Sequence, residues 1–272
     1  MNLELASLIN DCWENRGRLS EAKVKEAILE TMDLLDCGTI RVAQPGPGGW
    51  TVNECIKKAI LLYFGVQSMA ELEAGPFHYH DKIPLKDRNR MLGVRAIPGS
   101  IIRKGAFAEK GVILMPSFVN IGAYVGEGSM VDTWATVGSC AQVGKRVHLS
   151  GGVGLGGVLE PPQAAPVIVE DDCFVGSRCI VVEGVRVEEG AVLGANVVLT
   201  ASTRIIDVSR SPAVEFSGRI PARSVVIPGT REKVFPGGTY QIPCALIIGT
   251  RKKSTDEKTS LNEALREFSV PV

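Results

Sequence analysis

Aromatic side chains and uncompensated charge are both scarce in this sequence. Phe, Trp and Tyr make up 6% of its 272 residues, whereas there are 30 glycines. This balance favours a fold with tight corners and small inward side chains. The 30 Lys and Arg residues match 30 Asp and Glu residues, so the formal net charge is zero. We therefore expect no extended basic surface for nucleic acid and no acidic tail.

The sequence also lacks a long apolar run. No stretch reaches the ~18 apolar residues that indicate a membrane-spanning helix, and the first residues, MNLELASLINDCWENR, are too acidic for a secretory signal. The 7 cysteines are scattered and odd in number, which indicates free thiols in a reducing compartment rather than a disulfide framework. We therefore expect a cytoplasmic protein that binds neither membranes nor nucleic acid.

What the sequence does have is an apolar residue at every sixth position. The period runs from residue 101 to 155 and, after an interruption at 160–166, from 169 to 205. A period of six fits neither an α-helix nor a simple alternating strand, but it is typical of a parallel β-helix in which three hexapeptides form one triangular coil. The in-phase residues are Ile101, Phe107, Ile113, Val119, Val125, Val131, Val137, Val143, Leu149, Leu155, Val169, Val175, Val181, Val187, Leu193, Leu199 and Ile205.

Small residues accompany this period. Cys173 and Cys179 occupy a small-residue position four after an in-phase residue, so we expect both thiols to be buried. Glycine often follows the in-phase residue directly, and we expect these glycines at corners with unusual backbone angles. They are Gly126, Gly138, Gly144, Gly156, Gly176 and Gly194. The interruption at 160–166 and a second one near 207–220 should leave the coils as external loops.

The rest of the chain divides into two further regions. Apolar spacing predicts helices at 3–16, 20–37 and 53–64, with short strands at 39–43 and 50–52. We therefore expect an α-rich domain and connector at 1–98, the β-helix at 99–230 and a C-terminal segment at 231–272. That last segment should hold a strand at 245–249 and an amphipathic helix at 260–268 that could cap the open end of the coils.

Several long runs resemble the tetrahydrodipicolinate N-succinyltransferase family of hexapeptide-repeat acyltransferases. They are MPSFVNIGAYV at 115–125, MVDTWATVGSCAQVGK at 130–145 and VHLSGGVGLGGVLEPPQA at 147–164, with RAIP at 95–98 and NEALR at 262–266. The resemblance covers nearly the whole chain. It implies a left-handed β-helix, a hand that the repeat itself does not give because parallel crossovers are usually right-handed.

The resemblance also implies an activity. The family transfers succinyl from succinyl-CoA to the amine of 2-amino-6-oxopimelate, the ring-opened form of tetrahydrodipicolinate, in lysine and diaminopimelate biosynthesis. Its members are typically homotrimers with active sites between subunits. Succinyl-CoA would act as a co-substrate, and the resemblance implies no permanently bound cofactor.

Acyl transfer to an amine needs a group that removes the amine proton. Asp132 is unusual in the repeat, because it stands at a corner where several other coils have glycine. The resemblance assigns this aspartate to contact with the substrate amine and to a role as base. The alternative is a corner aspartate that bonds backbone N–H groups. Arg95 matches the family's substrate-binding arginine, and a guanidinium suits the substrate's carboxylates; the alternative is a surface arginine at a domain junction.

The sequence departs from the family at one position. The family usually reads RSEVVEG where this chain has RCIVVEG at 178–184, so Ile180 replaces a glutamate that is proposed to assist catalysis. Isoleucine cannot carry a proton. Either the second carboxylate is dispensable, or Glu183 substitutes as a catalytic residue, or the activity or substrate has shifted. Glu183 is equally compatible with a solvated corner residue.

The glycine-rich run at 150–157 suits close approach of an extended ligand. We expect Ser150, Gly151, Gly152 and Gly157 to contact the pantetheine arm of the acyl-CoA much as an added strand would, with the loop after Leu159 covering it. Cations near the C-terminal coils are candidates for its phosphates. They are Arg204, Arg251, Lys252 and Lys253, the last three being equally readable as a solvated charge run.

The histidines are weaker candidates. His148 precedes an in-phase residue, so its side chain should point outward, and the family assigns it no role as base. His78 and His80 have a spacing seen in metal sites, but they lie in an irregular connector, and we expect no metal. A zinc hydratase on this fold would need three clustered histidines, whereas only His148 lies within the repeats. Another acyl-CoA-dependent N- or O-acyltransferase and a non-catalytic solenoid remain the alternatives.

Overall fold

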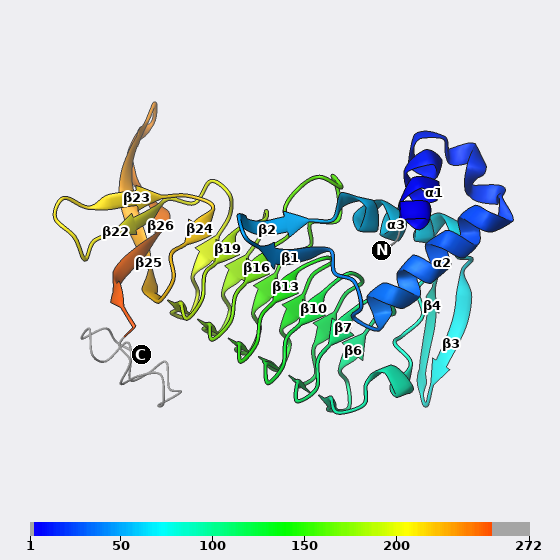
Figure 1. Cartoon of the computed structure of the whole chain (residues 1–272). Helices are drawn as coiled ribbons and strands as arrows, with labels where there is room; N and C mark the ends of the chain where they lie inside the picture. The colour runs from blue at the N-terminus through cyan, green and yellow to red at the C-terminus, as the bar shows by residue number, and fades with distance from the viewer. Residues whose placement is uncertain (1–2, 252–272) are drawn as a thin grey trace.

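The N-terminal part of the protein is a small helical domain. The computed structural model describes residues 3–251 (Figure 1). The helices α1 (Leu3–Glu14), α2 (Ala22–Asp36) and α3 (Glu54–Val66) confirm the three predicted helices. Their apolar faces meet in one core that includes Ile9, Ile28 and Ile60. No helix among the described residues is long and apolar enough to cross a bilayer.

Two short hairpins accompany these helices. Strands β1 (Ala43–Gly46) and β2 (Gly49–Val52) pair antiparallel, so the first strand begins later than predicted and includes the Pro-Gly turn residues. The connector contains a second hairpin that the sequence analysis did not predict, formed by β3 (Ala70–Ala74) and β4 (Phe77–Asp81). Single 3-10 turns lie at Arg16–Ser20 and Arg88–Arg90.

The middle of the chain is a left-handed parallel β-helix, as predicted, with three sheets of short strands. The β5 sheet begins with β5 (Arg95–Ala96), β8 (Ile113–Leu114), β11 (Met130–Val131), β14 (His148–Leu149), β17 (Phe174–Val175) and β20 (Val192–Leu193). The β6 sheet contains β6 (Ile101–Ile102), β9 (Phe118–Val119), β12 (Thr136–Val137), β15 (Gly154–Leu155), β18 (Ile180–Val181) and β21 (Val198–Leu199). The β7 sheet contains β7 (Phe107–Ala108), β10 (Tyr124–Val125), β13 (Gln142–Val143), β16 (Ile168–Val169), β19 (Arg186–Val187) and β24 (Arg219–Ile220).

The six-residue period predicts the inward residues correctly from Val119 onward but not before it. Val119 through Ile205 are buried in the core of the coils. In the first coil, however, Ile102, Ala108 and Leu114 are the buried residues, and the predicted Ile101, Phe107 and Ile113 are only half-buried. The cause is a corner that is one residue short, since the inward residues Leu114 and Val119 are five positions apart.

The corner glycines are required for a different reason than predicted. None of the six expected glycines has a positive φ. A Cβ at Gly126 would lie 2.5 Å from the carbonyl carbon of Gly144 in the next coil, which is closer than any real contact. The left-handed backbone occurs two residues later, for example at Gly128 (φ 70°) and Trp134 (φ 61°). The glycines therefore let successive coils stack closely.

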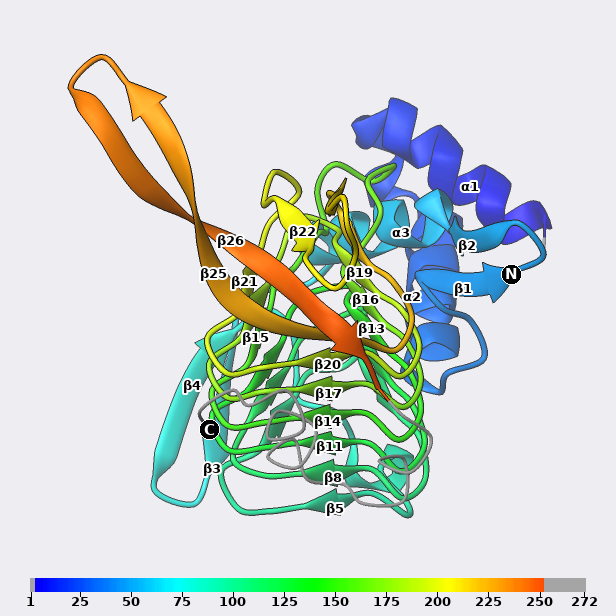
Figure 2. The same ribbon diagram turned by 90° about the vertical axis from the view of Figure 1, so that its left-hand side faces the viewer.

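The helical domain packs against the β7 sheet. Asp36 of α2 accepts from the backbone N–H of Gly105, just before β7, at 2.8 Å and pairs with the buried Lys86 at 2.8 Å, and the indole Nε1 of Trp50 donates to Glu170 Oε1 at 2.7 Å. Figure 2 shows the β5 sheet face-on, with the helical domain to one side and the β3–β4 hairpin to the other. These two units therefore leave the β5 sheet and its corners uncovered.

The C-terminal end of the coils carries two more hairpins. Strand β22 (Ile205–Asp207) pairs with β23 (Val214–Phe216), within the second predicted excursion. Strands β25 (Ser224–Phe235) and β26 (Gly238–Thr250) form a long antiparallel hairpin that projects from the body (Figure 2). The predicted strand at 245–249 is part of β26, and residue 231 lies inside β25. The predicted capping helix at 260–268 lies outside the described residues.

Candidate active site

One corner of the coils contains four of the residues that the sequence analysis selected: Asp132, Ser150, Gly151 and Gly152. The parallel register places Val131 beside Leu149 and Leu149 beside Val175. The residues that follow these three must stack as well, between the β5 and β6 sheets. We call this set the Asp132 corner; it comprises residues 132–134, 150–152 and 176–178.

Asp132 has one engaged and one free carboxylate oxygen. Its Oδ1 accepts hydrogen bonds from the backbone N–H of Thr133 at 2.6 Å and from the Thr133 hydroxyl at 3.2 Å. Its own N–H donates to the Leu149 carbonyl at 2.9 Å, which fixes the corner on the next coil. Within residues 3–251 no donor contacts Oδ2. Asp132 thus bonds a backbone N–H of its corner, as the structural alternative predicts, and its second carboxylate oxygen can still contact a ligand.

Trp134 lies in the same corner in an unfavourable conformation. Its φ is 61°, a region that bulky residues rarely adopt. The side chain is also 75% exposed, so it gains little from burial within this chain. The same left-handed backbone recurs at other corner residues such as Cys140 and Asn196, so it belongs to the coil geometry and is not by itself evidence of function.

His148 points outward from the β5 sheet, as predicted. It is half-buried and stacks on Phe174, with ring centroids 4.9 Å apart and planes 3° from parallel. Burial lowers the pKa of His148, and the nearby Asp132 charge only partly offsets this. The imidazole is therefore neutral at pH 7, packed against its neighbour on the adjacent strand.

Arg95 is exposed on the outer face of β5. Strand β11, which leads to Asp132, lies two strands away in the same sheet, or about 10 Å along the coil axis. No residue among 3–251 accepts a hydrogen bond from the Arg95 guanidinium. The predicted substrate-binding arginine and the predicted base therefore share one open side of the molecule.

Glu183 lies at a different corner. It follows β18 between the β6 and β7 sheets, is exposed, and its Oε2 accepts from the Ala201 backbone N–H at 3.1 Å. This bond to the next coil matches the structural alternative. Asp132 and Glu183 are separated by a full side of the prism, so one chain does not bring them together. Ile180 lies on the outer face of β18, 36% exposed.

The glycine run is divided between two corners. Ser150, Gly151 and Gly152 belong to the Asp132 corner, whereas Gly156 and Gly157 follow β15 at the next one. A Cβ on Gly152 would lie 2.8 Å from Arg178 Cδ, and one on Gly154 would lie 2.8 Å from Ile180 Cδ1. Side chains of the following coil therefore already cover two of these glycines, and direct ligand contact at Ser150, Gly151, Gly152 and Gly157 stays a prediction.

The loop after Leu159 packs on the helical domain. The buried ammonium of Lys57 in α3 donates to the carbonyl oxygens of Pro161 at 3.0 Å and Ala164 at 2.8 Å. Leu159 packs against the core of the helical domain. These contacts anchor the loop to the N-terminal domain, and its covering of an acyl-CoA arm stays a prediction.

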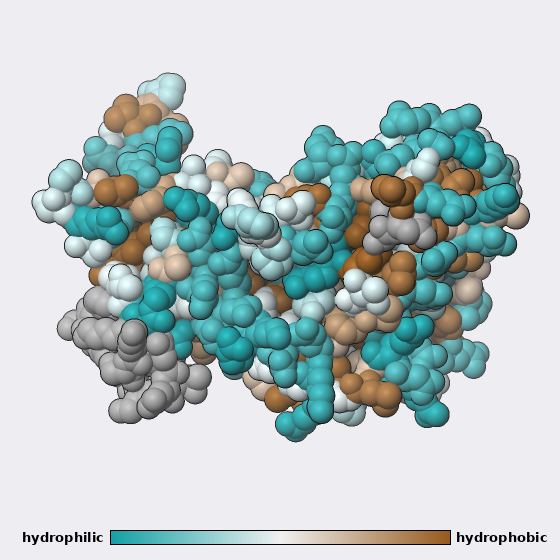
Figure 3. Space-filling model, viewed as in Figure 1, coloured by the Kyte–Doolittle hydropathy of each residue, from teal (hydrophilic) through white to brown (hydrophobic). Residues whose placement is uncertain are grey.

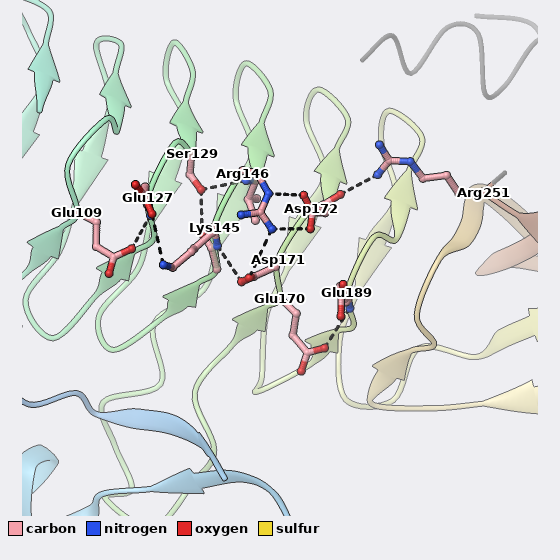
Figure 4. Close-up of polar contacts among 12 residues, drawn as sticks. Glu109, Glu127, Ser129, Lys145, Arg146, Glu170, Asp171, Asp172, Glu189 and Arg251 are labelled. Atoms are coloured by element: carbon pink, nitrogen blue, oxygen red, sulfur yellow. Dashed lines mark hydrogen bonds and ion pairs between the residues drawn. The ribbon is translucent and has the colours of Figure 1, made fainter. Parts of the chain in front are cut away.

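The cations expected near coenzyme phosphates have other partners. Arg204 lies 3.8 Å from Glu215 across the β22–β23 hairpin. Arg251 donates to the Asp172 carbonyl oxygen at 2.7 Å, next to the paired charges drawn in Figure 4. Lys252 and Lys253 lie outside the described residues. Both arginines thus make contacts within the protein, and phosphate binding by either of them stays a prediction.

Those paired charges line the corner between the β7 and β5 sheets, opposite the β6 sheet. Arg146 binds Asp172 with two hydrogen bonds of 2.7 and 2.8 Å, and Lys145 lies 3.4 Å from Glu127 (Figure 4). Hydrophilic residues predominate over the coils in the view of Figure 3. This corner is a stabilising ion-pair ladder, unlike the Asp132 corner.

The remaining histidines do not form a metal site. His78 and His80 lie on β4, each 3.8 Å from a glutamate of β3. Among residues 3–251 no three His, Cys, Asp or Glu side chains form a group that could hold a metal. All described cysteines are free, and Cys173 and Cys179 are buried as predicted.

Comparison with known proteins agrees with this geometry. Residues 4–66 match the family model "Tetrahydrodipicolinate N-succinyltransferase N-terminal", and residues 166–201 match "Hexapeptide repeat of succinyl-transferase". The chain is 50% identical to the 2,3,4,5-tetrahydropyridine-2,6-dicarboxylate N-succinyltransferase of Ralstonia nicotianae over 277 residues, which cover 98% of this chain and 99% of that protein.

The chain belongs to the tetrahydropyridine-dicarboxylate N-succinyltransferase family. The enzymes of the same name from Neisseria meningitidis serogroup B and Afipia carboxidovorans are 50% and 48% identical to it, each over 97% of this chain. The alignments cover 99% and 98% of the lengths of these two enzymes. Membership therefore extends over both the helical domain and the coils.

The sequence analysis missed one residue of the Asp132 corner. Arg178 follows β17 and places its side chain over Gly152. Its sequence signal was the arginine that opens the RCIVVEG run, but only the structure shows which corner it joins.

Proposed function

We propose that this chain transfers succinyl from succinyl-CoA to the amine of ring-opened tetrahydrodipicolinate. The observation that carries the proposal is the Asp132 corner, where a carboxylate oxygen without a partner faces the same open side as Arg95. Family membership supports the choice of substrates, because relatives with about 50% identity over their full length bear this enzyme name.

The chemistry needs one proton acceptor at the amine. The amine nitrogen attacks the thioester carbonyl carbon, a C–N bond forms, and the C–S bond breaks. Asp132 Oδ2 accepts the proton that the nitrogen loses and passes it to the departing sulfur, so that CoA leaves as the thiol. Arg95 would bind a substrate carboxylate with two hydrogen bonds and so hold the amine near Asp132.

A homotrimer with sites between subunits would complete this arrangement. Residues 3–251 of a single chain leave the Asp132 corner open, and Glu183 lies on another corner of the prism. If a second copy brings its own corner to Asp132, Glu183 can join the same site; otherwise it keeps only its bond to Ala201. Sedimentation equilibrium of the purified protein measures this directly.

A second acyltransferase activity is favoured by one observation. Ile180 places an apolar, partly exposed side chain where the resemblance implies a carboxylate. An apolar wall is compatible with another acyl group, such as acetyl. The alternative is therefore an acyl-CoA-dependent N- or O-acyltransferase with a different donor.

Turnover of the purified protein separates the two. With tetrahydrodipicolinate as acceptor, succinyl-CoA should give a much larger kcat/KM than acetyl-CoA, measured by thiol release and by the mass of the product. A higher kcat/KM with acetyl-CoA would favour the alternative, and no thiol release with either donor would contradict both.

A further inference from the structure

The arginines of the coils differ in whether they have an acidic partner. Between residues 95 and 200 the chain has five arginines, and three of them are ion-paired. Arg103 binds Asp81 at 2.6 Å, Arg146 binds Asp172 at 2.7 Å, and Arg186 binds Glu170 at 2.6 Å. Within residues 3–251, no oxygen accepts a hydrogen bond from the guanidinium of either Arg95 or Arg178.

These two unpaired arginines flank Asp132. In the β5 sheet, β11 lies midway between β5 and β17, with one strand between each pair. Arg95 is on β5, and Arg178 is in the corner that follows β17. The Arg178 side chain leans back over Gly152, where an added Cβ would lie 2.9 Å from its Nε. The side chain therefore extends over the neighbouring coil, which lies between Arg178 and Asp132.

The backbone of Arg178 has the left-handed conformation that recurs at the corners of the coils. Its φ of 61° is a left-handed conformation, which arginine does not favour, and its N–H donates to the Gly151 carbonyl at 3.1 Å. The side chain is exposed and gains no ion pair. Ile180, the next outward side chain, adds no charge that could neutralise it. An unpaired guanidinium over a glycine beside a candidate base is arranged to bind an anion.

We propose that Arg178 binds a carboxylate of the bound reactants on the side of Asp132 opposite Arg95. This inference rests on the proposed function and deepens it. Two reactants could supply the carboxylate: the acceptor, which has one at each end, and the succinyl group of the donor. A planar guanidinium suits either, because it offers two parallel N–H donors to a carboxylate.

The chain contains a matched control for this residue. Arg146 occupies the same position within its hexapeptide, three after the inward residue, and it is also left-handed (φ 52°). It differs in lying at the opposite corner and in being paired with Asp172. Asn196 occupies the equivalent position in the coil after Arg178, with φ 63°. Asparagine should therefore preserve the backbone in both Arg178→Asn and Arg146→Asn.

The test compares these two variants with the parent protein. Calorimetric titration with pimelate, a seven-carbon dicarboxylate without the amine, and with succinate measures carboxylate binding without turnover. Initial rates give KM for tetrahydrodipicolinate and the ratio of kcat/KM for succinyl-CoA and acetyl-CoA. We expect Arg178→Asn to weaken either acceptor binding or the preference for succinyl-CoA about tenfold or more. Arg178→Lys should restore part of the lost interaction. Arg146→Asn should change neither acceptor binding nor donor preference.

The two sources give different results. A raised KM for the acceptor with weaker pimelate binding assigns the carboxylate to the acceptor. A lower preference for succinyl-CoA over acetyl-CoA assigns it to the succinyl group. If the parent protein turns over and Arg178→Asn matches Arg146→Asn in every measurement, the inference is wrong while the proposed function stands. If the parent shows no turnover, the proposed function fails, and the titrations still decide whether Arg178 binds carboxylate.

Discussion

The buried Lys57 of α3 donates a hydrogen bond of 2.8 Å to the carbonyl of Ala164 in the loop after β15. The same ammonium also binds the Pro161 carbonyl at 3.0 Å. A lysine of the N-terminal domain thus holds an excursion of the β-helix. Burial lowers the pKa of this ammonium, and its two carbonyl partners balance part of the desolvation cost.

Replacement of this lysine should destabilise the fold and leave chemistry intact. Lys57→Met removes the donor from two carbonyls, and we expect the free energy of unfolding to fall by about 2–4 kcal/mol. Protease sensitivity in 158–166 should rise. The value of kcat/KM should stay near that of the parent, because the loop lies away from the Asp132 corner. Lys25→Met, an exposed lysine on α2, is the control in urea denaturation; equal stability of both variants would contradict the role of Lys57.

The ion-pair ladder should make stability depend on pH at acid values. Arg146 lowers the pKa of Asp172 below its usual value, so the folded state binds the proton less readily than the unfolded state. The resulting stabilisation is present above about pH 4 and is lost as pH falls through the folded pKa.

Arg146→Asn tests this dependence. The side chains are 58% and 39% exposed, so solvent screening limits the loss at pH 7 to at most about 1 kcal/mol. We expect the difference from the parent, measured by urea midpoints, to shrink progressively as pH falls below about 4. A difference that is constant from neutral to acid pH would rule out the Asp172 carboxylate as its source.

His148 should affect stability more than catalysis. Loss of its stacking on Phe174 in His148→Asn should cost about 0.5–1.5 kcal/mol. Because Asp132 is the proposed base, we expect kcat/KM to change less than about fivefold and its pH profile to keep its shape. Disappearance of an acid limb from that profile, with a loss of a hundredfold or more, would make His148 the base.

How far the sequence predicts this fold depends on the type of signal. The six-residue period predicts the coils because each turn repeats the same small inward volume. It cannot tell which of two adjacent apolar residues, such as Ile113 and Leu114, points inward, since both can be buried. That choice depends on the length of the corner that follows, which is visible only when the strands are paired.

Two hairpins were missed although the sequence contains signals for them. Gly75 and Pro76 separate β3 from β4, and Pro236 and Gly237 separate β25 from β26. Both pairs are typical turn residues, and the segments beside the first pair, AELEA and FHYHD, alternate between polar and apolar or aromatic residues.

The candidate site was partly predictable for a related reason. Asp132 is conspicuous because it interrupts a series of corner glycines. Arg178 is not, because its importance lies in having no acidic partner and in reaching over Gly152, and these relations join residues of different coils.

The most direct test of the account is succinyl transfer by Asp132→Asn. Asparagine can still accept the Thr133 N–H, so the corner should keep its shape, but it cannot take a proton from the amine. We predict a loss of about 10²–10⁴ in kcat/KM with succinyl-CoA and tetrahydrodipicolinate, with the melting temperature and the affinity for CoA unchanged. A rate within about threefold of the parent would show that Asp132 is not the base and would contradict the proposed mechanism.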